Sequence, residues 1–467
     1  MPKNPICRFE SIEIDPSLIR KYDTAGPRYT LYPVADRFVE EFDAVRYQHA
    51  VKASNLVRHG RTISLYIHLP FCETECLYCA CNHVVTRDKA QAARYLDFLE
   101  REMAMQADLF PGASVHQLHL GGGTPTFLSD AQLMRLMGML KRTFNFVADA
   151  RYSVEIDPRR VGQHTLALLA SQGFSRMSLG VQDIHPRVQA AVNRILPLES
   201  TTRVLQSAAA LGFRSINIDL IYGLPCQTID SFIQTLDTIT ALRPQRITLY
   251  RYTHTPDRIR SQRRIDAATL PGPSDQMAMQ IESVKRLLEA GYVYIGLEQF
   301  ALPDDELALS LRQGRLHYDM QGYATHADSD RVGLGVSAIG KVGNAYSQNH
   351  RELEHYYDAI DRGAVPIARG LMLSADDILR RAVIQALLCQ GELVFEPFET
   401  SWMIDFRRYF GHEWVQLDAL AADGLIQLAA DAIRITPRGR PLARVVAAVF
   451  DKYLREAQLA ARYSRII

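Results

Sequence analysis

Four of the seven cysteines lie within ten residues, in the segment PFCETECLYCACN. Cys72, Cys76 and Cys79 have the spacing Cys-x3-Cys-x2-Cys, and Cys81 follows two residues later. Three thiolates on one short loop can bind three irons of a cubane cluster and leave the fourth iron without a protein ligand. An open coordination position is typical of a catalytic metal site, not a structural one. The spacing therefore predicts a 4Fe–4S cluster that binds a further ligand.

A structural zinc loop is the alternative interpretation of these cysteines. Zinc takes four nitrogen or sulfur ligands, often from two separated pairs, and the four cysteines together with His83 could supply them. The sequence has no second Cys/His pair at such a spacing. The odd number of cysteines and the polar N-terminus argue against a disulfide framework and for metal chemistry in a reducing cytoplasm.

The overall composition excludes several classes of protein. The chain has 467 residues, of which 47% are hydrophobic and 22% charged, as in a globular protein with a sizeable core. Lys and Arg total 53 against 52 Asp and Glu, so no global charge attracts nucleic acid or an anionic membrane. No apolar run reaches the length of a membrane span. We therefore expect no nucleic-acid partner and no membrane partner.

The elements that would position the cysteines alternate between strands and helices. Apolar, β-rich segments lie at 63–69, 115–120, 151–156, 176–182, 215–221 and 246–252, separated by amphipathic stretches such as 91–107, 130–143 and 199–211. This alternation predicts an α/β fold with a parallel sheet, open or curled into a partial barrel. In such folds, functional residues gather at the carboxyl ends of the strands.

The predicted strands are each followed by polar or glycine-rich residues. The cysteine loop follows the first strand and Gly121-Gly122-Gly123-Thr124 follows the second, where the backbone can approach a ligand closely. Glu155 and Gln182 end the third and fourth strands, and Asp219 lies within the apolar fifth strand. A buried carboxylate requires a partner. If Asp219 has a purely structural role, its partner would be an arginine.

The chain changes character after residue 370. Ser374 precedes two aspartates and resembles an N-cap, helical stretches follow at 376–388 and 414–422, and residues 424–436 read as a hairpin. This order is typical of a winged-helix-like module. The balanced charge disfavours DNA binding, so we expect a cap over the barrel.

The motifs place this chain near a known family. CETECLYC resembles the cluster loop of the radical S-adenosylmethionine (SAM) enzymes. Together with GPRYTLYP, SLYIHLPFC, LHLGGGTPT, VEIDPR, IDLIYGLP and the terminal SRII, the whole chain resembles the oxygen-independent coproporphyrinogen III oxidases. The resemblance implies a partial (β/α)6 barrel of the radical SAM type. It divides the chain into an N-terminal arm (1–50), a catalytic domain (51–365) and a helical, winged-helix-like C-terminal cap (366–467).

The resemblance also implies roles for particular residues. Cys72, Cys76 and Cys79 would bind the cluster, whose fourth iron binds SAM, and a second SAM would lie beside the first. Cofactor-binding positions would be Tyr66, Tyr78, Gly122, Gly123, Thr124, Glu155, Gln182, Arg194, Asp219, Thr253 and Ile339. Tyr66 and Cys81 would be catalytic, with Cys81 marking the oxidase subfamily. Two departures from the family, at Thr253 and at Glu298-Gln299, bear on the substrate.

The implied reaction converts two propionate side chains of coproporphyrinogen III to vinyl groups, giving protoporphyrinogen IX, by means of a 5′-deoxyadenosyl radical. A flavodoxin- or ferredoxin-type protein would donate the electrons to a cytoplasmic, monomeric enzyme. The alternatives are a radical SAM enzyme that acts on another tetrapyrrole or transfers a methyl or methylene group, and a haem-binding or haem-transfer protein.

A tetracarboxylate substrate requires cations in the cavity. The candidate cations are Arg251, Arg258, Arg260, Arg263 and Arg264. Three histidines, His68, His83 and His254, are candidate neighbours of the substrate or the cluster.

Overall fold

The computed structural model describes residues 11–57, 62–325 and 329–455. Cys7, the first ten residues of the predicted arm and the terminal SRII lie outside this part of the chain. Six parallel strands form the centre of a twelve-stranded sheet, and their order along the sheet follows the chain. They are β1 (Thr62–Leu69), β4 (Ser114–Gly122), β5 (Asn145–Ile156), β6 (Phe174–Gln182), β7 (Ser215–Tyr222) and β8 (Arg246–Arg251). The prediction of six parallel strands is confirmed.

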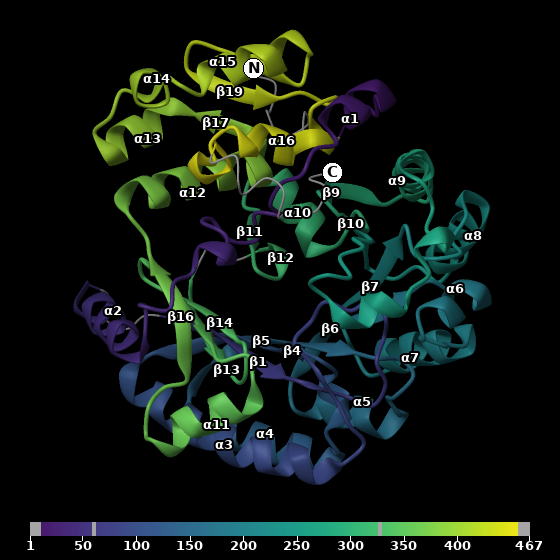
Figure 1. Cartoon of the computed structure of the whole chain (residues 1–467), viewed down its shortest axis with the longest axis vertical. Helices are drawn as coiled ribbons and strands as arrows, with labels where there is room; N and C mark the ends of the chain where they lie inside the picture. The colour runs from purple at the N-terminus through teal and green to yellow at the C-terminus, as the bar shows by residue number, and fades with distance from the viewer. Residues whose placement is uncertain (1–10, 58–61, 326–328, 456–467) are drawn as a thin grey trace.

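Helices between the strands cover the outer face of this sheet (Figure 1). They are α3 (Lys89–Leu109), α4 (Asp130–Thr143), α5 (Gln163–Ser171), α6 (Pro186–Ala191), α7 (Leu198–Ala210) and α8 (Ile229–Ala241). Alternate strand residues such as Val154, Leu179 and Ile218 are fully buried beneath them. The residues between these, which face the other side of the sheet, are mostly polar. The curled sheet thus has an apolar outer face and a polar inner face.

Further strands extend the sheet at both ends. β13 (Asp330–Leu334) pairs in parallel with β1 and is followed by the antiparallel β14 (Ile339–Val342), β15 (Ala345–Asn349) and β16 (Ile367–Met372). At the other end, β10 (Gln299–Ala301) pairs with β8 and with β9 (Val293–Gly296), after α9 (Pro273–Glu289). Strand β16 shows that the sheet continues past residue 365, where the sequence places the end of the catalytic domain. Two short helices, α10 (Glu306–Arg312) and α11 (Leu353–Asp361), and the hairpin β11 (His317–Asp319) with β12 (Gly322–Ala324) complete this part of the chain.

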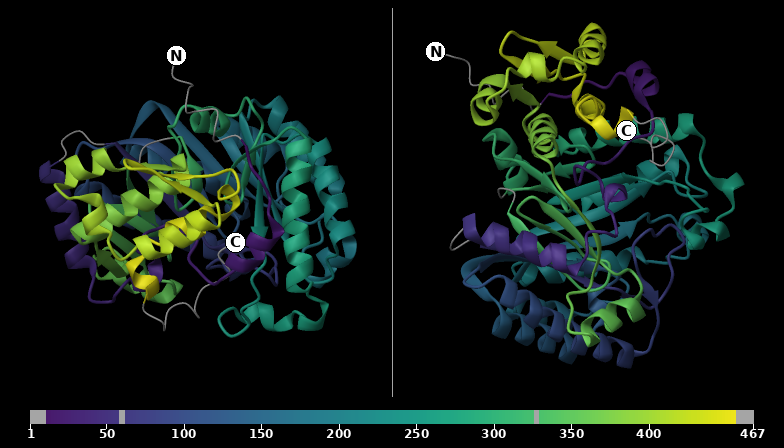
Figure 2. Two further views of the ribbon diagram at one scale, coloured as in Figure 1. Left: turned by 90° about the horizontal axis from the view of Figure 1, so that it is seen from above. Right: turned by 60° about the vertical axis from the view of Figure 1, so that its left-hand side comes forward.

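The C-terminal part contains the predicted helices and hairpin. Its helices are α12 (Ala375–Gln390), α13 (Phe395–Trp402), α14 (Phe406–Tyr409), α15 (Trp414–Ala422) and α16 (Ala443–Ala448). Three strands, β17 (Glu392–Val394), β18 (Ile426–Leu428) and β19 (Ala432–Ile435), form a small sheet in the order β17-β19-β18. Ser374 caps α12 through a capping box with Asp377, as the sequence predicts. Figure 2 shows this domain on one side of the barrel and the outer helices on the other.

The N-terminal arm runs between the barrel and the C-terminal domain (Figures 1 and 2). Its helix α1 (Pro16–Tyr22) buries Leu18 and Ile19 in one apolar cluster with the C-terminal domain, and Tyr29 and Tyr32 belong to the same cluster. Helix α2 (Ala44–Val57) then leads to β1. The arm therefore joins the two larger parts of the molecule.

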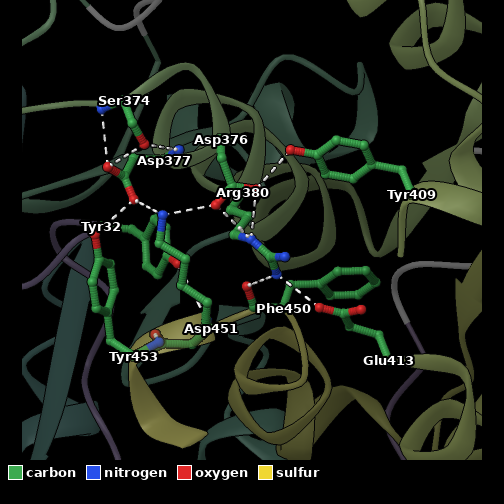
Figure 3. Close-up of polar contacts among 11 residues, drawn as sticks. Tyr32, Ser374, Asp376, Asp377, Arg380, Tyr409, Glu413, Phe450, Asp451 and Tyr453 are labelled. Atoms are coloured by element: carbon green, nitrogen blue, oxygen red, sulfur yellow. Dashed lines mark hydrogen bonds and ion pairs between the residues drawn. The ribbon is translucent and has the colours of Figure 1, made fainter. Parts of the chain in front are cut away.

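Polar contacts hold the arm and the chain's last described turn to α12 (Figure 3). The Lys452 ammonium lies 2.7 Å from carboxylate oxygens of both Asp376 and Asp377. The Tyr29 hydroxyl donates to Asp451 at 3.0 Å, and the Lys452 amide donates to the Tyr32 hydroxyl at 3.4 Å. We call Asp451 and Lys452, with these partners, the C-terminal clamp.

Candidate functional site

The cysteine loop begins where β1 ends. A short parallel ladder between β2 (Phe71–Cys72) and β3 (Val84–Val85) closes the loop at its base. The Gly123 amide donates to the Leu69 carbonyl at 2.9 Å and the Thr124 amide donates to the Phe71 carbonyl at 2.9 Å. The glycine run after β4 is therefore bound directly to the base of the cysteine loop, as two neighbouring strand ends allow.

Hydrogen-bond donors surround the predicted ligand sulfurs. The Cys76 Sγ lies 3.4 Å from Nη1 of Arg194 and 3.7 Å from Nη2 of Arg159, and the Cys72 Sγ lies 3.4 Å from the Thr124 hydroxyl. A hydrogen bond from Cys81 and one from His83 lower the pKa of Cys79 despite its burial. The neighbours of Cys79 thus favour its thiolate form, which is the form that binds metal, whereas burial raises the pKa of Cys72 to about 12.

The three cysteines fit a cluster. Among the residues that the structure describes, no three Cys, His, Asp or Glu side chains converge as the ligands of one ion do. A cubane cluster instead carries one thiolate on each of three irons, so its ligands surround a larger body. The donors around Cys72 and Cys76 would offset the negative charge of such ligands.

A cavity of about 710 Å³ lies beside this loop on the inner face of the sheet. Six of the predicted site residues line it, on β1, the cysteine loop, β4, β5, β7 and β14: Tyr66, Cys81, Gly122, Glu155, Asp219 and Ile339. The arm contributes Arg28, Tyr29, Thr30 and Leu31 to the wall, so part of the predicted arm does reach this cavity.

Two carboxylates on the cavity wall have pKa values that are shifted in opposite directions. Glu155 accepts hydrogen bonds from the Gly122 amide at 3.1 Å and from Nε2 of His119 at 3.2 Å. Burial alone would raise the pKa of Glu155, but these contacts lower it overall. Burial raises the pKa of Asp219 to about 6, and its donors are the Ser178 hydroxyl and the Asn217 amide, not the arginine expected for a structural pair.

Arg194 and Gln182 do not line the cavity, and both lie close to Gly180, where an added Cβ would be 3.1 Å from Gln182 and 3.2 Å from Arg194. The Arg194 guanidinium contacts the Gly180 carbonyl, Asp157 at 3.3 Å and Cys76. Within the described residues, Oε1 of Gln182 and Nε of Arg194 are buried without a hydrogen-bond partner. Buried polar atoms are rarely left so in a complete site. This observation fits a polar ligand bound at these strand ends.

Tyr78 and Thr253 are brought together by one glutamine. The Gln262 amide donates to the Thr253 carbonyl at 3.1 Å and to the Tyr78 carbonyl at 3.3 Å. Neither residue lines the cavity; Tyr78 is part of the cysteine loop, and Gln262 links Thr253 to it. Of the three candidate histidines, His68 lines the cavity and bonds the Tyr66 hydroxyl at 3.0 Å, whereas His254 bonds Tyr252.

The family departure at Glu298-Gln299 lies on the cavity wall. Glu298 binds the guanidinium of Arg444 at 2.5 and 2.7 Å, which connects this wall to the C-terminal domain. Gln299 accepts a hydrogen bond from the Tyr323 amide at 2.8 Å.

The arginines that the sequence suggested for the substrate do not line the cavity. Arg251 pairs with Asp23 at 3.0 Å, and Arg264 pairs with Glu75 at 2.7 Å. Among the described residues, five other arginines line it instead: Arg28, Arg151, Arg176, Arg246 and Arg331. The sequence analysis did not identify these five arginines. For Arg151 a signal was available: it stands four residues before Glu155 in the same strand, and alternate strand residues share a face.

The barrel and the three-cysteine loop at its strand ends define a class of enzymes. Residues 66–239 match the model of the radical SAM superfamily, and residues 373–442 match the HemN C-terminal domain, which begins directly after β16. Membership of this superfamily implies a 4Fe–4S cluster and SAM.

Comparison with individual proteins narrows the class. The chain is 47% identical to the oxygen-independent coproporphyrinogen III oxidase of Pseudomonas aeruginosa, over 98% of this chain and 100% of the relative. It is 43% identical to the oxygen-independent coproporphyrinogen III oxidase of Escherichia coli K12, over 98% of this chain and 99% of the relative. The structure of the Escherichia coli enzyme, described as a radical SAM enzyme, superposes with a TM-score of 0.90 at 42% identity, covering 95% of this chain and 100% of that one. The chain belongs to the family of oxygen-independent coproporphyrinogen III oxidases.

Proposed function

We propose that the chain catalyses the oxygen-independent oxidative decarboxylation of coproporphyrinogen III. Two propionate side chains become vinyl groups, and the product is protoporphyrinogen IX. The observation that carries this function is the three-cysteine loop at one end of a cavity lined with arginines, in a chain nearly half identical to enzymes of that name.

The site residues divide into two groups. Cys72, Cys76 and Cys79 would hold the 4Fe–4S cluster. The polar strand ends from Gly122 to Asp219 would hold SAM, and we expect two SAM molecules there, side by side. When bound, these cofactors supply one-electron chemistry that removes a hydrogen atom from a substrate carbon.

The chain's own residues would bind and orient the substrate. The cavity is enclosed by the curled sheet, the arm and the β11–β12 hairpin, so that water is displaced when a ligand fills it. Guanidinium groups on its wall match the propionate carboxylates, and Glu155, held by His119 and Gly122, offers a carboxylate to the cofactor end. Tyr66 and Cys81 face the same space beside the cysteine loop.

The remaining parts of the proposal concern partners. A low-potential flavodoxin- or ferredoxin-type protein would donate the electrons, and the enzyme would act as a cytoplasmic monomer without nucleic-acid or membrane partners. Within the described ranges, no helix combines the length and apolarity needed to cross a bilayer.

Anaerobic reconstitution with iron and sulfide, followed by assay with SAM, a reductant and coproporphyrinogen III, tests the function. We expect vinyl product and CO2 together with cleaved SAM. Cleavage of SAM without vinyl product would contradict the proposal, and stoichiometric haem binding without turnover would favour a haem-transfer protein.

The ligand assignment has its own test. Replacing Cys72, Cys76 or Cys79 by alanine should abolish the iron–sulfur absorption. The control is Cys226→Ala, because Cys226 lies in the loop after β7, outside the cysteine loop. A Cys76→Ala protein that keeps full iron content would show that the assignment is wrong.

A further inference from the structure

Three arginines from three strands meet at one end of the cavity. Arg151 on β5, Arg176 on β6 and Arg246 on β8 all contact the carboxylate of Glu306 at the start of α10. The Arg246 Nη2 lies 2.7 Å from Glu306, and the Arg151 Nη1 lies 3.3 Å from it. We call these three residues the arginine cluster.

The arginine cluster carries more positive charge than its partners offset. Asp305, which caps α10 and is nearly inaccessible, binds Nε of Arg246 at 2.9 Å. Three guanidinium groups therefore share the two carboxylates of Asp305 and Glu306, which leaves an excess of one positive charge. Burial and the neighbouring arginines lower the pKa of Arg176 to about 10, as expected where cations outnumber anions.

The excess charge faces the cavity. All three arginines line the cavity, whereas Asp305 and Glu306 are not among the described residues of its wall. The Arg151 side chain is 34% exposed and that of Arg176 23%. The two carboxylates thus anchor the guanidinium groups from behind, in fixed orientations, while the cavity side remains open to a ligand.

The arginine cluster lies at the end of the cavity away from the cysteine loop. Arg151 and Glu155 are inward-facing residues of the same strand, four residues apart, which corresponds to about 13 Å along the strand. Glu155 lies at the carboxyl end with the cysteine loop, and Arg151 lies toward the amino end. A ligand held by the arginine cluster therefore extends from there toward the reacting end.

We propose that Arg151, Arg176 and Arg246 form the subsite that binds a propionate carboxylate of the substrate other than the one that reacts. This inference rests on the proposed function for the identity of the ligand. A planar carboxylate can accept paired hydrogen bonds from guanidinium groups, and one carboxylate balances the excess charge. The subsite fixes the substrate's orientation, so that a chosen propionate reaches the cofactor end.

Binding of coproporphyrin III, the stable oxidised form of the substrate, tests the subsite by fluorescence titration of the reconstituted enzyme. We expect Arg151→Gln and Arg176→Gln to weaken porphyrin binding by about tenfold or more, the usual effect of losing a charged hydrogen bond. Affinity for SAM should stay within twofold, and Arg151→Lys should recover part of the loss. The matched control is Arg135→Gln, because Arg135 also bridges two carboxylates, Asp97 and Glu100, but on the outer helices.

The outcomes separate the subsite from the function. Unchanged porphyrin affinity in both variants, or equal losses of porphyrin and SAM affinity, would overturn the subsite. A wild-type enzyme that forms no vinyl product would overturn the proposed function instead. Arg151→Gln is the variant that best preserves folding, because Arg151 is the most exposed of the three arginines.

Discussion

Cys81 differs from the three preceding cysteines because it lines the cavity and they do not. The proposed cluster would not require it, since Cys72, Cys76 and Cys79 would supply three ligands. Its thiol donates a hydrogen bond to Cys79, and the residue lines the cavity that would hold the substrate. This position supports the prediction that Cys81 is catalytic.

We expect Cys81→Ala to keep its iron content and to lower turnover by about 10²-fold, the lower part of the range for a side chain positioned at the reacting group. Iron analysis and the rate of vinyl formation measure the two effects. Loss of iron together with turnover would make Cys81 a ligand, and unchanged turnover would remove it from the catalytic residues.

A buried carboxylate on the outer helices makes stability depend on pH. Glu102 on α3 is fully buried and accepts hydrogen bonds from Tyr356, Asn349 and the Gly335 amide. Burial raises the pKa of Glu102 from 4.5 to about 7 despite these donors. The folded chain therefore holds this proton more tightly than the unfolded chain, and the free energy of unfolding falls as pH rises from about 4.5 through 7, by about 3 kcal/mol from this group.

The Glu102→Gln variant should lose this part of the pH dependence. Urea denaturation of the wild-type protein and the variant between pH 5 and 8.5 gives the slope of the free energy of unfolding against pH for each. The difference between the two slopes cancels the contribution of other titrating groups. Equal slopes would show that Glu102 keeps an ordinary pKa in the folded protein.

At the scale of elements, the contact between the glycine run and the cysteine loop decides the geometry of the cofactor end. A Cβ at Gly123 would lie 2.6 Å from the Pro70 carbonyl oxygen and 2.9 Å from that of Phe71. Because these are backbone atoms at the base of the cysteine loop, an added methyl group must push the two strand ends apart.

We therefore expect Gly123→Ala to weaken SAM binding by about tenfold or more, corresponding to at least about 1.4 kcal/mol. Equilibrium binding of SAM to the reconstituted protein measures the change. Gly162→Ala is the control, because a Cβ there meets nothing within 4 Å. Equal affinities of the two variants would show that the strand ends tolerate the displacement.

For the whole molecule, the C-terminal clamp connects distant parts of the chain to the cavity. Lys452 binds α12, its amide reaches Tyr32 of the arm, and neighbouring arm residues form part of the cavity wall. Loss of the ammonium would leave Asp376 and Asp377 side by side without their shared cation.

We expect Lys452→Met to lower the free energy of unfolding by about 1 kcal/mol or more, to speed proteolysis of the arm and to raise the KM for the porphyrinogen several-fold. Urea denaturation, limited proteolysis and steady-state kinetics measure these effects. Lys141→Met, on the exposed face of α4, should change none of them. An unchanged arm and KM would show that the clamp is only a surface ion pair.

The sequence by itself determined the six parallel strands, the cysteine loop and the winged-helix-like cap. These features depend on the periodicity and spacing of residues within short segments of the chain, which can be recognised without the tertiary structure. It also placed Glu155 at the end of a parallel strand, where functional residues gather, and Glu155 does line the cavity.

Only the tertiary structure decided which arginines face the cavity and what holds Asp219. The arginine cluster joins β5, β6 and β8 to α10, and its charge excess exists only because Glu306 is shared. Likewise, Arg251 is turned away by Asp23, a residue of the arm more than two hundred positions earlier. Such contacts depend on how the sheet curls and where the arm lies, and no local pattern specifies either.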